Sequence, residues 1–116
     1  MTKKDLIQYC LDHYECFEDY PFDETTAVMK LRSNNKMYAL ISERNDALYI
    51  NLKCNPDEAI TLRELYVGIS EGWHMNKKHW NTVLPDSDLP FELIEKMIFD
   101  SYNLVKPKSS KKTKQA

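Results

Sequence analysis

The stretch Gly72-Trp73-His74-Met75-Asn76-Lys77-Lys78-His79-Trp80-Asn81-Thr82-Val83 gathers the most unusual side chains of this chain. It holds both tryptophans, two of the three histidines and a pair of adjacent lysines. Residues 73–75 and 79–84 are each short enough to be a strand, and Asn76-Lys77-Lys78 between them is typical of a turn. The stretch therefore predicts a hairpin with a polar, basic tip.

Three runs of alternating apolar and polar residues precede this hairpin, at 27–32, 37–42 and 48–53. Alternation with a period of two is typical of strands that bury one face. The residues expected on that face are Ala27, Met29, Leu31, Leu48, Ile50 and Leu52. The short turns at 33–35 and 43–46 make the three strands an antiparallel meander.

Two helices are predicted near the ends of the chain. The first runs from about residue 3 to residue 13, where Thr2 and Asp5 can form a capping box. The last begins at Leu89-Pro90 and runs through residue 105 with an apolar stripe on one side. The members of that stripe are Ile94, Met97, Ile98, Tyr102 and Val105.

A further helix is predicted between the meander and the hairpin. Asn55 is an N-cap residue, and Pro56 suits the first helical position. The helix should run to about residue 65 and end at Gly68. Its inward side chains are expected to be Ala59, Leu62, Leu65 and Tyr66.

The segment 12–24 holds six acidic residues and no basic one. Four aromatic residues are interleaved with these acids, and Pro21 interrupts the segment. We predict an irregular crossing that its aromatics attach to the core. The acids form a solvated face in the simplest interpretation, and weak binding of a hard cation is the alternative.

Length and composition indicate one domain. The chain has 116 residues, of which 42% are hydrophobic and 29% charged, as in ordinary globular proteins. We predict an α+β domain at 1–105, with two layers in the order helix, three strands, helix, two strands, helix and an antiparallel sheet. Residues 106–116, with five lysines and no acid, are predicted to be a disordered tail.

Charge and cysteine content limit the partners and the compartment. Removing the five tail lysines from the net charge of −2 leaves −7 for residues 1–105, so nucleic-acid binding would need a local basic patch. Cys10, Cys16 and Cys54 form no pairing pattern, and we interpret them as reduced thiols that fill the core. Without a membrane span or a secretion signal, we expect a cytoplasmic monomer.

Four blocks of the sequence resemble the conserved blocks of the MmcQ/YjbR family of small bacterial proteins. They are Tyr20-Pro21-Phe22, Lys36-Met37-Tyr38-Ala39-Leu40, Asn51-Leu52-Lys53-Cys54-Asn55-Pro56 and His74-Met75-Asn76-Lys77-Lys78-His79-Trp80-Asn81-Thr82-Val83. The resemblance implies a CyaY-like (frataxin-like) fold, described as a double wing, and a role in binding DNA.

The predicted hairpin offers the groups that a nucleic-acid contact needs. Its lysines can neutralise phosphates, its amides and hydroxyl can donate hydrogen bonds, and Trp80 has a face for stacking. The candidate contact residues are Lys53, Asn76, Lys77, Lys78, His79, Trp80, Asn81 and Thr82. Alternatively the hairpin is structural, with core aromatics and solvated lysines, and the domain is a regulatory module that binds a protein or a small ligand.

Catalytic and metal-binding patterns have little support. His74 and His79 are five residues apart, which matches neither a helical pair nor a fixed strand spacing for a metal. The chain has no nucleophile elbow, and its two glycines, Gly68 and Gly72, cannot build a phosphate-cradling loop. We therefore expect a binding protein that is not an enzyme and needs no cofactor or metal.

Overall fold

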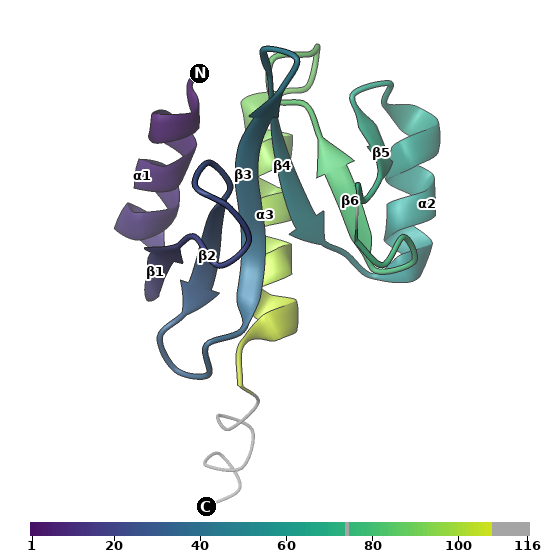
Figure 1. Cartoon of the computed structure of the whole chain (residues 1–116). Helices are drawn as coiled ribbons and strands as arrows, with labels where there is room; N and C mark the ends of the chain where they lie inside the picture. The colour runs from purple at the N-terminus through teal and green to yellow at the C-terminus, as the bar shows by residue number, and fades with distance from the viewer. Residues whose placement is uncertain (74, 108–116) are drawn as a thin grey trace, which may run out of the picture.

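The computed structural model describes residues 1–73 and 75–107, which form a small α+β domain (Figure 1). The elements in chain order are α1 (Lys3–His13), β1 (Cys16–Asp19), β2 (Ala27–Leu31), β3 (Met37–Arg44), β4 (Ala47–Lys53), α2 (Pro56–Leu65), β5 (Ile69–Glu71), β6 (Trp80–Val83) and α3 (Phe91–Val105). The strands form one antiparallel sheet in the order β1-β2-β3-β4-β6-β5. The predicted class and sheet type are confirmed.

The three helices cover one face of the sheet. α1 packs against β1, β2 and β3, α3 packs against β3 and β4, and α2 packs against β5 and β6. In Figure 1, α3 lies behind the middle of the sheet, with α1 and α2 toward its two edges. The opposite face has no helix among the described residues, and we call it the outer face. No described helix is long and apolar enough to cross a membrane.

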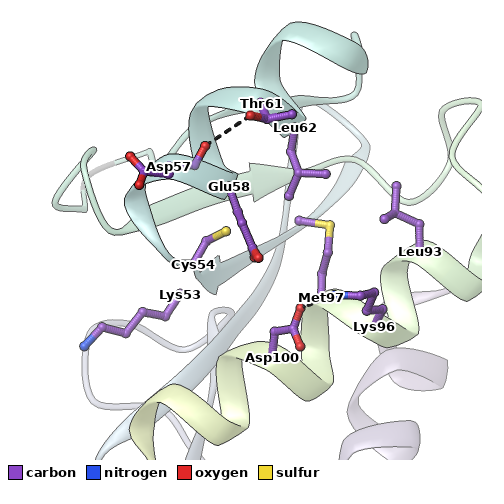
Figure 2. Close-up of a pocket in the computed structure, with 10 residues that line it drawn as sticks. All are labelled: Lys53, Cys54, Asp57, Glu58, Thr61, Leu62, Leu93, Lys96, Met97 and Asp100. Carbon is purple, nitrogen blue, oxygen red and sulfur yellow. Dashed lines mark hydrogen bonds and ion pairs between the residues drawn. The ribbon is translucent and has the colours of Figure 1, made fainter.

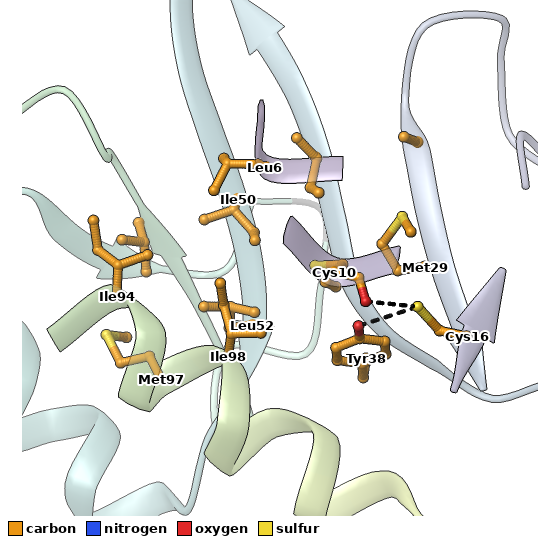
Figure 3. Close-up of a cluster of buried hydrophobic side chains, with 14 of the residues drawn as sticks. Leu6, Cys10, Cys16, Met29, Tyr38, Ile50, Leu52, Ile94, Met97 and Ile98 are labelled. Atoms are coloured by element: carbon orange, nitrogen blue, oxygen red, sulfur yellow. Dashed lines mark hydrogen bonds between the residues drawn. The ribbon is translucent and has the colours of Figure 1, made fainter. Parts of the chain in front are cut away.

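The core between helices and sheet contains the apolar residues predicted from strand alternation (Figure 3). Met29, Ile50 and Leu52 from the strands are fully buried there, as is Ile98 of α3. The predicted apolar stripe of α3 is confirmed, with Tyr102 partly buried at its side. The three cysteines are buried free thiols, and Cys10 and Cys16 fill the core as expected, whereas Cys54 lies outside this cluster.

Two of the sequence predictions for strands were wrong. The acidic segment contains β1, an edge strand that pairs with β2 and is joined to it by an ion pair of 2.8 Å between Asp19 and Lys30. The first strand of the hairpin is Ile69–Glu71, not 73–75, and Trp73 is in a turn. A Cβ at Gly72 would lie 2.8 Å from the Cβ of Trp80, so glycine allows the two chains to approach closely where β5 ends.

The helix ends follow from capping. Thr2 and Asp5 form the predicted capping box of α1, and the Asn55 side chain caps α2. The prediction that Gly68 ends α2 was wrong, because Tyr66 is the C-cap and donates its backbone N–H to the Leu62 carbonyl at 3.0 Å. Leu65 was also predicted inward but is 67% exposed. Of the predicted tail, residues 108–116 lie outside the described residues.

Ser101 joins α3 to the two strands beneath it. Its hydroxyl donates to the Tyr38 carbonyl of β3 at 2.6 Å and accepts the Lys53 backbone N–H of β4 at 2.9 Å. The side chain is fully buried. A single hydroxyl therefore satisfies two backbone groups and fixes α3 along the strands.

We predict that Ser101→Ala lowers the free energy of unfolding by about 1–3 kcal/mol, because it leaves both backbone groups without this partner. Urea unfolding measures the change as a lower midpoint at an unchanged slope. Ser33→Ala, at an exposed turn position, is the matched control and should change stability by less than about 0.5 kcal/mol. Equal effects of the two substitutions would contradict the assignment.

Candidate functional site

The described part of the loop between β5 and β6, residues 72–73 and 75–79, lies against the outer face of the sheet. Met75 packs against a second apolar cluster on that face, made of Val28, Leu40 and Trp80. Trp73 lies edge-on to Tyr49 of β4, with ring centroids 4.9 Å apart. The loop thus covers part of this face, and Trp73 is half-buried there.

Thr82 holds the start of this loop to the sheet. Its hydroxyl accepts the Trp73 backbone N–H at 2.8 Å and donates to the Asn51 side-chain oxygen at 2.7 Å. Asn51 and Thr82 are partners in the β4–β6 register, so their side chains emerge side by side. Both are buried, and their hydrogen bonds compensate the loss of water.

Asn81 makes the corresponding contact on the helix side. Its side-chain oxygen accepts a hydrogen bond of 2.7 Å from Arg63 of α2. The same guanidinium nitrogen lies 3.4 Å from the Lys77 carbonyl and donates to it. Arg63 therefore connects α2 to both β6 and the loop, while the Asn81 amide nitrogen has no partner among the described residues.

The tip of the loop is the polar turn predicted at Asn76-Lys77-Lys78. The Asn76 side-chain oxygen accepts the backbone N–H groups of Lys78 and His79, at 2.9 and 3.3 Å. The Lys77 ammonium donates to the Gly72 carbonyl at 3.2 Å, which closes the loop at its base. Lys78 is exposed at this ordered turn.

The eight candidate contact residues divide by burial. Asn76, Lys77 and Lys78 are exposed, and Lys53 and His79 are half-buried. Lys53 is opposite Trp80 in the register, and the backbone N–H of Cys54 donates to the His79 carbonyl at 2.7 Å. These residues therefore lie at the same end of the sheet.

The other three candidates are structural side chains. Trp80 is 7% exposed, and Asn81 and Thr82 are fully buried. The Thr82 hydroxyl and the Asn81 side-chain oxygen bond within the protein, and the indole packs in the outer-face cluster, so the prediction that these residues offer surface groups does not fit the structure. His74 lies outside the described residues. The alternative interpretation, a hairpin with a structural interior and lysines at its tip, describes this part of the site better.

Two outer-face residues were not among the sequence candidates. The Arg44 guanidinium carbon lies 4.9 Å from the centroid of the Trp73 ring, which itself contacts Tyr49. Tyr49, Asn51 and Lys53 are two residues apart along β4 and therefore share one face. The strand period alone places Tyr49 on the outer face. Nothing in the sequence shows that Arg44, at the far end of β3, meets the loop.

A separate pocket of about 330 Å³ opens between α2 and α3 at the end of β4 (Figure 2). Its lining residues are Lys53, Cys54, Asp57, Glu58, Thr61, Leu62, Leu93, Lys96, Met97 and Asp100. Burial raises the pKa of the Cys54 thiol to about 11, and the nearby carboxylates of Glu58 and Asp100 add to this rise. The thiol is therefore a poor nucleophile near neutral pH.

Neither region has the composition of a metal centre. Within residues 1–73 and 75–107, no three histidine, cysteine or acidic side chains are grouped closely enough to hold a metal ion. The acids of the segment 12–24 instead accept local hydrogen bonds, as Asp23 does from the backbone N–H groups of Thr25 and Thr26. These bonds hold the pKa of Asp23 below its usual value.

Comparison with known proteins assigns the chain to a family. A family model described as YjbR matches residues 11–104. The chain belongs to the YjbR family. The protein YbdF of Escherichia coli O157:H7 is similar to this chain, at 37% identity over 86 residues, which are 74% of this chain and 69% of YbdF.

Solved structures agree with the fold. Deinococcus radiodurans protein DR2400 superposes with a TM-score of 0.83 at 38% identity, covering 93% of this chain and 80% of that one. A protein from Pseudomonas syringae gives a TM-score of 0.82 at 31% identity, covering 91% of this chain and all of the other. The arrangement of helices and sheet is therefore shared with these proteins.

We predict that Thr82→Val lowers the free energy of unfolding by about 1–3 kcal/mol, because the shape is kept while two buried groups lose their partner. Hydrogen exchange at the Trp73 amide should also become faster, since its acceptor is removed. Thr25→Val, at an exposed position, is the control. Unchanged protection of the Trp73 amide in Thr82→Val would show that the hydroxyl does not hold the loop.

Proposed function

We propose that this YjbR-family chain is a small, non-enzymatic module that binds nucleic acid on its outer face. The observation that supports the proposal is the meeting of basic and aromatic side chains there. Arg44 contacts Trp73, and Lys77 bonds the residue before Trp73. Lys53 follows two residues after Asn51, whose side-chain nitrogen lies 3.5 Å from the Trp73 carbonyl.

These groups suit a phosphate backbone and exposed bases. Lysine and arginine neutralise phosphates, and half-exposed aromatic rings such as Tyr49 and Trp73 can stack on bases. Four such cationic contacts, from Arg44, Lys53, Lys77 and Lys78, would give a salt slope of about −3.6 on duplex DNA. A fourfold rise in salt would then weaken binding on the order of 150-fold.

The distribution of acidic residues supports the approach of a nucleic acid to the loop between β5 and β6. The acidic segment 12–24 contains β1, which is one edge of the sheet, whereas the loop between β5 and β6 lies toward the opposite edge. Repulsion from the acidic edge would direct a polyanion toward the basic loop. A domain with net negative charge can in this way present one cationic region.

The proposal also covers the fold type, the cellular compartment and the oligomeric state of the protein. Helices on one face of an antiparallel sheet support a CyaY-like, double-wing description, in which the outer face remains free for a partner. Three buried free thiols support a reducing, cytoplasmic compartment. We propose that the protein acts there as a monomer.

Fluorescence anisotropy with labelled duplex and single-stranded oligonucleotides, at about 50 and about 200 mM salt, tests the proposal. Lys77→Ala/Lys78→Ala should reduce the duplex slope from about −3.6 to about −1.8. Lys4→Ala/Lys36→Ala removes the same charge from exposed positions in α1 and in the turn before β3, and should leave the slope unchanged. Absence of binding, or equal slopes for the two double variants, would overturn the proposal.

Two further variants separate charge from structure. Lys77 also closes the loop through its bond to Gly72. Lys78→Ala removes one charge and leaves that bond intact, so it should reduce the magnitude of the salt slope by about 0.9. Replacing the four lysines at 108, 111, 112 and 114 with glutamine tests the tail. If this tail variant alone abolishes binding while Lys78→Ala has no effect, the outer face is not the contact surface.

The alternative function is a regulatory domain that binds a protein or a small ligand. The specific observation in its favour is the pocket between α2 and α3, which lies on the helix side of the sheet. A pull-down that recovers one stoichiometric protein partner, unchanged by nuclease treatment, would favour this alternative. Loss of the recovered material on nuclease treatment would favour the first proposal.

A further inference from the structure

We propose that the pocket between α2 and α3 is a binding site for a small amine with an apolar body. The pocket is built from the end of β4, the first two turns of α2 and the middle of α3. It lies among the helices, whereas the candidate nucleic-acid surface is on the outer face. The inference therefore does not depend on the proposed function, and each can fail without the other.

The interior of the pocket suits an apolar group. Leu62, Leu93 and Met97 form its walls, and the buried thiol of Cys54 lies at its base (Figure 2). The thiol has no hydrogen-bond partner within the described part of the chain, so a ligand displaces no internal bond there. The volume of about 330 Å³ is in the range of small-molecule sites, which are mostly apolar with a few placed polar groups.

The charged side chains of the pocket favour a cation over an anion. Glu58 of α2 and Asp100 of α3 flank the opening and point toward one another across it in Figure 2. Asp100 is already paired with Lys96 at 2.7 Å. The ammonium of Lys53 points away from the pocket in the same view. Glu58 thus faces the opening and forms no ion pair with any of the described residues.

A primary amine matches both parts of this site. Its ammonium can donate to Glu58, with Asp100 close enough to add attraction, while its carbon chain or ring occupies the space between Leu62, Leu93 and Met97. A carboxylate in the same position would face Glu58 and Asp100 and be repelled. A neutral alcohol would keep the apolar contact and lose the charge-assisted bond.

Binding of 4-phenylbutylamine to the full chain, followed by amide NMR shifts, tests the inference. Shifts should cluster at the end of β4, in α2 and in the middle of α3. Glu58→Gln keeps the shape of the side chain and should weaken binding on the order of 10-fold. Glu64→Gln, on α2 but outside the pocket lining, is the matched control and should leave the affinity unchanged.

Two related probes define the charge preference. 4-Phenylbutanol should bind wild type on the order of 10-fold more weakly than the amine, and Glu58→Gln should reduce this difference, leaving only the attraction of Asp100 for the amine. 4-Phenylbutyrate should bind more weakly still. Equal affinities of amine and carboxylate, equal effects of Glu58→Gln and Glu64→Gln, or shifts confined to other surfaces would overturn the proposal.

Cysteine alkylation gives a second measurement that does not rely on substitutions. Occupation of the pocket should slow the reaction of Cys54 with iodoacetamide, because the ligand covers the thiol. Cys10 and Cys16 are buried in the main core and serve as internal references whose rates should not change. A ligand-independent rate at Cys54, at amine concentrations that saturate the NMR shifts, would place the amine elsewhere.

Discussion

The structure depends on β6, a strand of four residues that is hydrogen-bonded on both sides and buried along its whole length. Its side chains alternate between the two faces of the sheet, and two of them, Asn81 and Thr82, are polar. A buried polar group must find a partner inside the protein or lose stability. Thr82 finds its partners in Asn51 and the loop, and Asn81 finds Arg63 of α2. The positions of the loop and of α2 both follow from this requirement.

The same contacts relate the two candidate sites. Arg63 belongs to α2, the helix that supplies Glu58 and Leu62 to the pocket, and it also bonds the Lys77 carbonyl in the outer-face loop. A ligand that moved α2 would therefore act on the residue that positions Lys77. The connection passes through one side chain and one strand, so the helix side and the outer face of the sheet are physically joined there.

The sequence predicted those features that depend on local chemistry. Capping residues predicted where α1 and α2 begin, and alternation predicted β2, β3 and β4. The sequence did not predict β1, because the acidic residues of this strand resemble a solvated segment. Pairing with β2 and the ion pair with Lys30 hold the strand in place. The polar residues of 74–83 suggested a surface, but Asn81 and Thr82 serve interior bonds. The pocket was missed because its lining comes from segments far apart in the chain.

The ends of the sheet have a consequence for self-association. An edge strand exposes unpaired backbone groups, which can recruit a strand from another molecule. Here β1 has four residues and includes Glu18 and Asp19, and β5 has three and includes Glu71. Two copies meeting edge to edge would oppose acids to acids over a very short ladder. The acids and the short length of both edge strands therefore disfavour growth of the sheet by strand addition from another copy.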